Sequence, residues 1–298
     1  DSLACLVPML LLMGIGIGGG YSLDSDYISE IMPRRWRLVM VGVAKASSSL
    51  GNIAVAVVCF LLLREWNDPH LWNRLLLIIS ALALIMILCR IRFEQSPGWL
   101  IARDRIPEAE KAVHYFLGPD VEIGEIRNRP RREQTAAVTW SSLFRKGNIQ
   151  KVIFSGVPWA CEGVGVYGIG VFLPVLVMAL GLEPASEGAF GHIVHSVKLT
   201  SWINLCILPG FVAGLLLVNR WYHVRTQVWG FLLCAAGMGL LLAAYKLHLP
   251  VWVAVAGFMT FELFLNAGPH LMTFIIPPQI YSVAERGAGT GLVGGCVP

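Results

Sequence analysis

The sequence is poor in charge, and this scarcity already limits what the protein can bind. Only 14% of its 298 residues are Asp, Glu, Lys or Arg, whereas 56% are hydrophobic and the mean hydropathy is +0.65. The formal net charge of +4 is small. Basic loops beside a membrane are enough to account for such an excess, so the sequence predicts no nucleic-acid partner.

Patterns typical of catalysis or metal binding are also lacking. The seven cysteines lie mostly inside apolar stretches, without metal-ligand spacing or a disulfide framework, and we interpret them as small core residues. No Ser, His and Asp set and no His and Cys cluster has catalytic or metal-site spacing, so we predict neither an enzyme nor a cofactor. No signal peptide is visible after Asp1, and we expect a fragment of a longer protein, with spans missing at both ends.

Long apolar stretches are what the sequence has in abundance. A helix needs about 20 apolar residues to cross a bilayer, and helices satisfy their own backbone groups where water is absent. We therefore predict an all-α fold, a polytopic transmembrane helical bundle. The expected spans cover residues 3–31, 38–63, 71–88, 152–182, 193–218, 228–245 and 249–276, and an eighth begins near residue 287.

Lys and Arg gather in loops that would share one face of the membrane if the spans alternate. The basic face holds Arg34, Arg35, Arg37, the loop 90–151, Arg220, Arg225 and Arg286, and the opposite face holds only Arg64, Arg74 and Lys246. The positive-inside rule places the basic face, and with it the central loop, in the cytoplasm. We expect a multi-pass protein of the plasma (inner) membrane.

The central loop separates two groups of predicted spans. Residues 1–89 would form the remainder of an N-terminal half with three helices, and residues 152–298 part of a C-terminal half with four helices and the start of a fifth. Between them, residues 90–151 are expected to form short amphipathic helices on the cytoplasmic membrane surface. In this loop, Ser96 can cap one helix, Pro107 can begin another and Gly118 can end it. The charged stretch 127–133 would be a linker, or merely a solvated connector.

A spacing that occurs twice in the sequence indicates a duplicated architecture. Glu30 lies seven residues before Arg37, where the first span meets the cytoplasm, and Gln279 lies seven residues before Arg286, where the seventh span does. Parallel repeats, which many transporters have, would produce this pattern. Chance similarity between two glycine-rich helix ends is the alternative.

Motifs in the same regions resemble a known family. Residues 14–23, together with Ser29, Glu30 and the segment PRRWR at 33–37, resemble the fourth helix of the major facilitator superfamily. The segment EQSPGWL at 94–100 is similar to the superfamily's ESPRWL signature after the sixth helix, with an inserted Gln and Gly98 in place of Arg. The resemblance covers nearly the whole chain, as helices four to ten and the start of eleven, and implies two helical halves and alternating-access transport.

Within the superfamily, the sequence is most similar to the phosphate:proton symporter branch, with sugar-porter features as well. The similar segments are 208–211, 219–220, 225–231, 266–270 and 273–277. Four positions depart from the branch: Gly20, Gly163 and Asn219 each stand where it has Asp, and His270 stands where it has Asn. The resemblance assigns two of the missing carboxylates to the binding of phosphate or its proton. It therefore implies the architecture of the branch but not phosphate as the solute.

Polar residues inside the spans are the candidate functional residues, because charges at that depth are costly. Lys45 lies at the same depth as Asp24 and close to that of Asp26, so a pair that serves an anion or a proton relay is possible. A structural ion pair or a lysine that reaches the surface is the alternative. Glu162, one position before Gly163, is a candidate proton carrier, or a partner in a polar helix contact.

Two further pairs share a helix face. His195 and Lys198 are three residues apart, although a hydrogen-bonded His and a lysine that reaches the surface would explain them equally well. Glu262 and Asn266 are four apart, just before a helix break expected at Gly268.

Together these observations predict a secondary active transporter, proton-coupled, for a small polar solute, with an anion favoured. Substrate binding is assigned to Lys45, Trp159, Tyr167, Lys198 and Asn266, proton coupling to Glu162 with Asp24 and Asp26, and a cytoplasmic gate to Glu30, Arg37, Gln279 and Arg286. The expected partners are the solute, protons and the lipid bilayer, and we expect a monomer. A sugar or organic-ion porter of the same superfamily, or a membrane receptor that does not transport, are the alternatives.

Overall fold

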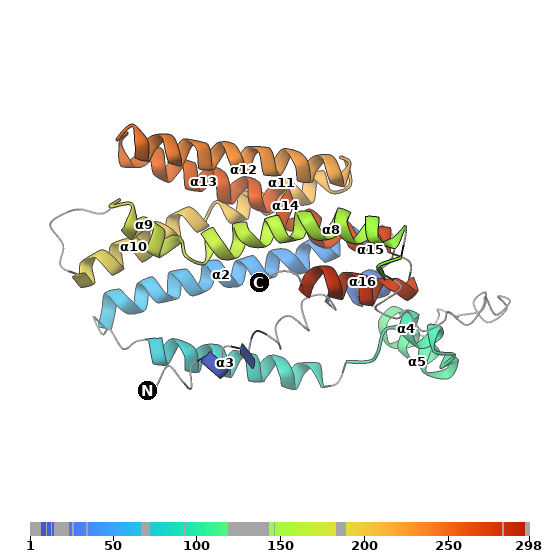
Figure 1. Ribbon diagram of the computed structural model, residues 1–298. Coiled ribbons are helices and arrows are strands. Elements are labelled where there is room, and N and C mark those ends of the chain that lie inside the picture. The colour runs from blue at the N-terminus through green and yellow to red at the C-terminus, as the bar shows by residue number, and fades with distance from the viewer. Residues whose placement is uncertain are drawn as a thin grey trace. The chain divides into compact units, whose positions relative to one another are not determined.

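The computed structural model describes most of the chain after the first predicted span. The described residues are 7–9, 11, 12, 14, 24, 25, 27–33, 35–66, 72–91, 93–118, 143–145, 147–182, 189–281 and 283–295. The predictions for Asp26, for the side chain of Arg286, for the linker 127–133 and for most of the first span lie outside them. All regular elements in the described ranges are helices, which confirms the all-α prediction (Figure 1).

The chain divides into two compact units. The first unit comprises Asp1–Val41, Glu94–Cys161 and Thr273–Pro298, and the second unit comprises Gly42–Phe93 and Glu162–Met272. The predicted halves, residues 1–89 and 152–298, stay a prediction.

Most of the helices lie wholly within either the first or the second unit. The first unit contains α4 (Pro97–Ala102), α5 (Ile106–Leu117), α15 (Pro277–Ile280) and α16 (Val283–Gly295). The second contains α3 (Trp72–Arg90), the π-helical segment η1 (Val164–Gly170), α9 (Leu173–Ala179), α10 (Ala189–Asn204), α11 (Ile207–Leu217), α12 (His223–Lys246) and α13 (Val251–Ala267). Helices α2 (Arg37–Trp66), α8 (Asn148–Gly163) and α14 (Pro269–Ile275) have residues in both units.

Five helical stretches in the described part of the chain are long and apolar enough to cross a membrane. They are Arg37–Arg64, Asn148–Gly170, Gly191–Leu217, His223–Lys246 and Val251–Ile280. Each corresponds to one of the predicted spans. Length and composition therefore support the spans, since about 20 apolar residues are enough to cross the hydrocarbon core.

Three of the apolar stretches are not single α-helices. Helix α8 passes into η1, where the Val171 amide donates a hydrogen bond of 3.0 Å to the Val166 carbonyl, five residues back. Helix α10 ends at Asn204, five residues before Pro209, and α11 begins at Ile207, so Pro209 lies in the first turn of α11, where the amide that proline lacks is not needed. The break predicted at Gly268 is confirmed, since α13 ends at Ala267 and α14 begins at Pro269.

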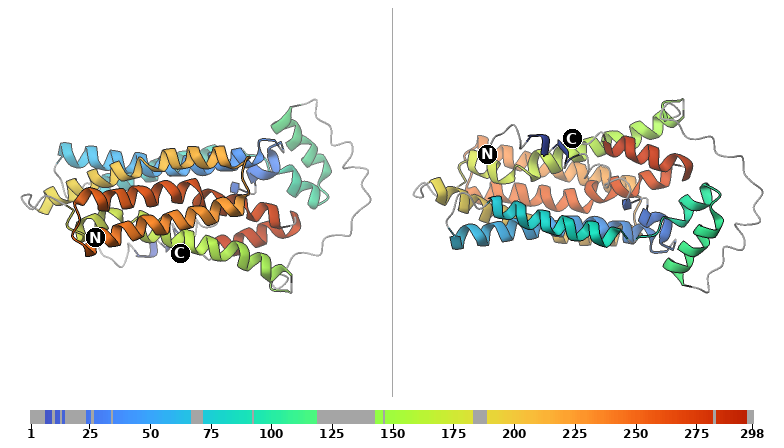
Figure 2. Two further views of the ribbon diagram at one scale, coloured as in Figure 1. Left: turned by 90° about the horizontal axis from the view of Figure 1, so that it is seen from above. Right: turned by 90° about the horizontal axis from the view of Figure 1, so that it is seen from below.

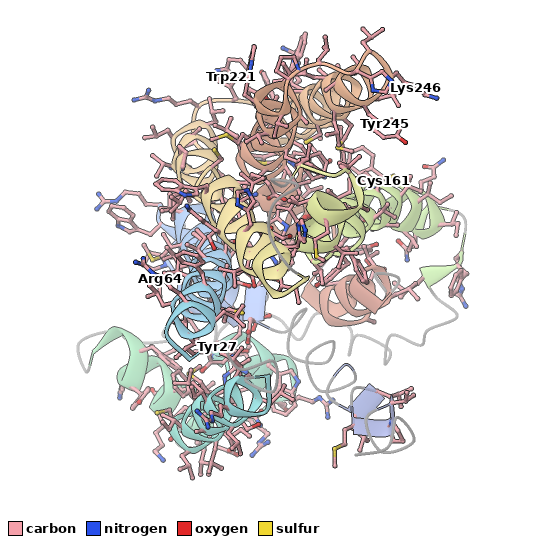
Figure 3. All side chains as sticks on the ribbon, turned by 90° about the vertical axis from the view of Figure 1, so that its left-hand side faces the viewer. Tyr27, Arg64, Cys161, Trp221, Tyr245 and Lys246 are labelled. Carbon is pink, nitrogen blue, oxygen red and sulfur yellow. The ribbon has the colours of Figure 1, made fainter. Side chains whose placement is uncertain are left out.

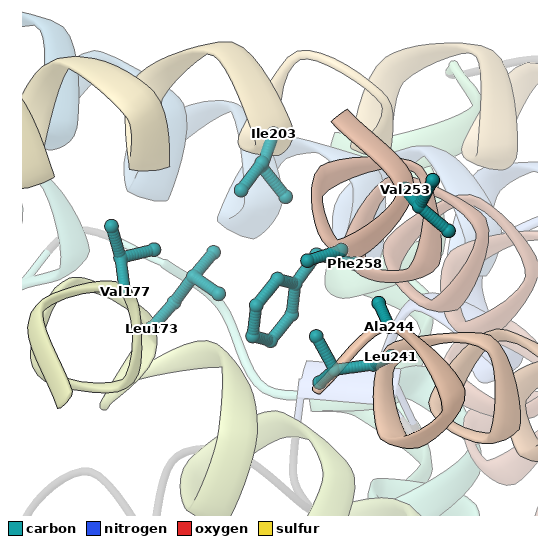
Figure 4. Packing of buried hydrophobic residues seen from close by; sticks show 8 residues of the cluster. Leu173, Val177, Ile203, Leu241, Ala244, Val253 and Phe258 are labelled. Carbon is teal, nitrogen blue, oxygen red and sulfur yellow. The ribbon is translucent and has the colours of Figure 1, made fainter. Parts of the chain in front are cut away.

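The core of the second unit lies between α9, α10, α12 and α13. Phe258 is fully buried at its centre, and Figure 4 shows the ring between Leu173 and Leu241. Helices α12 and α13 lie side by side (Figures 1 and 2) and approach closely at Gly237 and Gly257. A Cβ atom on either glycine would lie 2.9 Å from the other's carbonyl oxygen, so only glycine permits this packing.

The short helices predicted for the central loop are confirmed in the first unit. Ser96 caps α4, because its hydroxyl oxygen accepts a hydrogen bond of 3.2 Å from the Trp99 amide. Helix α5 has Pro107 in its first turn and ends just before Gly118, whose φ of 96° favours glycine. The two helices pack together (Figure 2) through a small core of Leu100, Ala109, Ala112 and Val113, against which Ile101 and Phe116 pack.

Candidate functional site

The second unit gathers buried ionisable side chains inside membrane-length helices. Lys45 on α2, Glu162 on α8, Glu262 on α13 and His270 on α14 are each only 3–6% exposed. Charged groups at such positions are costly and usually face one another or a substrate pathway. We therefore take these four residues, with Asn266, as the candidate site.

Glu162 and His270 form the central contact of this site. Nδ1 of His270 and Oε1 of Glu162 share a hydrogen bond that joins α14 to α8, over 108 residues of sequence. Phe211 of α11 meets the imidazole edge-on, with 5.8 Å between ring centroids. The imidazole is thus held by a carboxylate on one side and an aromatic ring on another, which fixes its orientation.

Lys45 adds a positive charge to the same site. Its ammonium group interacts electrostatically with both Glu162 and His270. One turn earlier on α2, Gly42 permits close packing, because a Cβ atom there would lie 3.1 Å from the side chain of Leu271. Lys45, Glu162 and His270 thus form a cluster drawn from three helices. The cluster carries no net charge when the imidazole is neutral.

Glu262 and Asn266 form a second polar pair, built on one helix. The Asn266 amide donates hydrogen bonds to the Glu262 carbonyl oxygen at 2.7 Å and to its carboxylate at 3.3 Å. This confirms that the two residues share a face of α13, as their spacing predicts. A Cβ atom on Gly170 would lie 3.5 Å from Oε1 of Glu262. The Glu262 carboxylate therefore faces the end of η1.

The other residues assigned to solute binding or coupling lie in varied surroundings. Trp159, in the first unit, is buried against Phe274, with ring centroids 4.8 Å apart. Tyr167 on η1 is half-buried. Lys198 on α10 is exposed and has no ion pair within the described ranges. Asp24 is exposed in the first unit, and its predicted pairing with Lys45 stays a prediction.

Some of the predicted gate residues come together in the first unit. Arg37 and Gln279 line a cavity of about 290 Å³ whose wall also includes Ser29 and Phe274. Gln279 donates a hydrogen bond of 3.0 Å from Nε2 to the Ile275 carbonyl.

Glu30 has a separate contact in the same unit, with the start of α4. Its carboxylate accepts a hydrogen bond from the Ser96 hydroxyl. A Cβ atom on Gly98 would lie 3.1 Å from Oε2 of Glu30, so the glycine at the position of the signature's Arg leaves room for this contact. The predicted gate role of Glu30 stays a prediction.

Comparison with known proteins identifies the family. A family model described as "Sugar (and other) transporter" matches residues 2–297. The chain belongs to this family. It is 26% identical over 292 residues to the inner membrane metabolite transport protein YgcS of Escherichia coli, with 96% of the chain and 59% of the relative covered. It is also 23% identical over 302 residues to the putative inorganic phosphate transporter 1-13 of rice, covering 95% of the chain and 58% of the relative.

The fold of this sugar-transporter family member matches a solved structure. The proton:xylose symporter XylE of the major facilitator superfamily superposes with a TM-score of 0.70 at 19% identity, covering 95% of the chain and 58% of XylE. The fold is therefore the one that the sequence motifs imply. The chain spans about 60% of the length of the relatives it matches.

Family membership bears on two broader predictions. The family consists of transporters, which agrees with the interpretation that the chain is not an enzyme. Together with the apolar helices, it makes the chain an integral membrane protein. Within the described residues, no group of three His, Cys, Asp or Glu side chains could hold a metal ion, and the five described cysteines are free thiols.

Sequence reasoning missed one residue of the site, His270. Its position was noticed only as a departure from the resembled phosphate branch, which has Asn there. Glu162 lies beside a second departure, at Gly163. The available signal was that His270 brings an ionisable group into a span, while Gly163 removes a carboxylate directly beside Glu162.

Proposed function

We propose that the full-length protein is a proton-coupled secondary transporter that moves a small anion by alternating access. The observation that carries this proposal is the buried cluster of Lys45, Glu162 and His270. A carboxylate hydrogen-bonded to an imidazole inside a membrane can gain and lose protons. A lysine beside it offers the positive charge that an anionic solute needs.

The same cluster offers a physical link between the solute and the proton. Without solute, the Lys45 ammonium and the Glu162 carboxylate attract each other. An anion that binds Lys45 pairs with its ammonium group in place of Glu162. Glu162 then binds a proton, because an unpaired buried charge is costly. Because such linkage is reciprocal, the proton also strengthens binding of the anion. Solute and proton are thus carried together.

The remaining assigned residues complete the proposal. Asn266, Trp159, Tyr167 and Lys198 contact the solute, Asp24 and Asp26 balance the charge of Lys45, and Glu30, Arg37, Gln279 and Arg286 close the cytoplasmic side. Two helical halves rock about the site and expose it to each side in turn. The protein would work as a monomer in the plasma (inner) membrane, with its central loop in the cytoplasm.

A proton-coupled sugar transporter is the second candidate. It is favoured by the name of the family and by the polar pair of Glu262 and Asn266, which offers both acceptors and a donor to hydroxyl groups. In this case Lys45 would serve as a structural partner of Glu162 and would not touch the solute.

The test uses the full-length protein in proteoliposomes with an inward proton gradient. Internal pH is recorded while phosphate, small carboxylates, sugars and organic cations are added one at a time. Acidification triggered by an anion alone supports the first candidate, and acidification triggered by a sugar alone supports the second. Uptake of labelled solute that ignores the gradient would overturn proton coupling and remove that role from Glu162.

A further inference from the structure

A depression at the turn between α11 and α12 combines positive charge with aromatic rings. Its volume is about 360 Å³. The lining residues are Arg220, Trp221, Tyr222, Arg225 and Trp229. No acidic side chain of the described part of the chain lines it, and none of these residues belongs to the proposed transport site.

The backbone of this turn is held by several hydrogen bonds. The amides of Arg220 and Trp221 donate to the Leu217 carbonyl at 3.0 and 2.9 Å. The His223 ring donates from Nε2 to the Val218 carbonyl at 2.9 Å, which ties the start of α12 to the end of α11. These bonds fix the backbone that carries the lining side chains.

The side chains around the depression point outward. The Arg225 guanidinium lies over the Tyr222 ring, 5.1 Å from its centroid. Trp221, Tyr222 and Trp229 are 55–75% exposed, and Figure 3 shows Trp221 on the outer side of its helices. Three large aromatic side chains beside each other on the surface need an apolar or interfacial partner.

The place of the depression in the chain indicates what that partner is. The turn joins two stretches of membrane-spanning length, Gly191–Leu217 and His223–Lys246, so it lies where a span leaves the hydrocarbon core. Tryptophan and tyrosine are enriched at the level of lipid headgroups. The planar guanidinium of arginine matches the oxygens of a phosphate, with two parallel hydrogen bonds.

We propose that this depression binds the headgroup of an anionic phospholipid. The two arginines bind the lipid phosphate, and the three aromatic rings pack against its glycerol and upper acyl region. An inorganic anion would use the arginines but would leave the rings exposed. Charge complementarity and the interfacial position therefore favour a lipid over a free anion.

The test measures lipid binding to the full-length protein in detergent by native mass spectrometry. Phosphatidylglycerol and phosphatidylcholine are titrated separately, and phosphatidylglycerol is expected to bind more tightly. The double variant Arg220→Gln/Arg225→Gln should bind phosphatidylglycerol about thirtyfold more weakly, since each cation near a membrane surface contributes about a factor of five. Each single variant should lose about fivefold by the same reasoning.

The matched control is Lys246→Gln, at the other end of α12, where the side chain is also exposed. This variant should retain phosphatidylglycerol as the unmodified protein does. Equal binding of both lipids, equal binding by the double variant, or release of the lipid by millimolar inorganic phosphate would each overturn the proposal. These outcomes do not depend on transport, so they are independent of the proposed function.

Discussion

The two buried carboxylates of the second unit are equally hidden but differently held. Glu162 is 3% exposed and Glu262 is 4% exposed. Glu162 has its hydrogen-bond partner on another helix, at His270, and interacts with the charge of Lys45 on a third. The side-chain partner of Glu262 is Asn266, four residues along the same helix.

This difference has a mechanical consequence. A pair on one helix keeps its geometry when that helix moves, because both side chains move with the same backbone. A cluster drawn from three helices changes whenever one helix shifts against the others. The surroundings of Glu162 would therefore change when its helices shift, whereas the hydrogen bond between Glu262 and Asn266 would not. The predictions below test this contrast.

Removal of Lys45 should have the largest effect. Lys45→Ala deprives a buried carboxylate of its positive partner, a change that typically destabilises a protein by about 3–5 kcal/mol. We expect a large fall in the melting temperature in detergent and loss of solute uptake in proteoliposomes. The control Lys246→Ala removes an exposed lysine and should change neither.

The double variant Lys45→Ala/Glu162→Gln separates stability from transport. Because no unpaired charge remains, it should recover much of the lost stability while uptake stays absent. A double variant as unstable as Lys45→Ala would show that Lys45 does not stabilise Glu162 and would contradict the three-helix cluster.

Replacement of the imidazole should have the next largest effect. His270→Asn introduces the residue of the resembled phosphate branch, but it removes the ring that bonds Glu162. Loss of a partner from a buried polar group costs about 1–3 kcal/mol. We expect reduced stability and a weaker dependence of uptake on the imposed proton gradient. An unchanged gradient dependence would remove His270 from the coupling pathway.

Glu262→Gln should have a smaller effect and so sharpen the contrast. The new amide keeps an oxygen that can accept the bond from Asn266, so stability should change by less than about 1 kcal/mol. Solute affinity can change, but the dependence of uptake on the proton gradient should not. Loss of gradient dependence in this variant, measured beside Glu162→Gln, would reverse the roles given to the two carboxylates.

The contrast also explains which parts of the molecule the sequence could predict. The pair of Glu262 and Asn266 follows from helix periodicity alone, and the break at Gly268 from a neighbouring proline. Glu162 and His270 are 108 residues apart, and no local rule relates them. Depth along the spans pairs Lys45 with Asp24 or Asp26, and this pairing stays a prediction, because depth does not say in which direction around a helix a side chain points.

Backbone irregularities inside the spans were equally hard to foresee. Apolar composition predicts that residues 152–182 cross a membrane, whatever the helix type. The π-helical segment η1 depends on a hydrogen bond from Val171 to Val166, and no hydrophobic period distinguishes it from an α-helix. The short helices α4 and α5 were predictable because their caps, Ser96, Pro107 and Gly118, are local signals.

A third carboxylate, Glu30, offers the smallest test, outside the second unit. Its partner, the Ser96 hydroxyl, also caps α4, so Ser96→Ala removes a helix cap together with the contact to Glu30. We expect a loss of about 1 kcal/mol, typical of a lost cap, measured as a small fall in melting temperature. Ser96→Thr keeps a hydroxyl and should recover most of the loss. Uptake should still depend on the proton gradient in both variants, because neither change touches the cluster around Glu162.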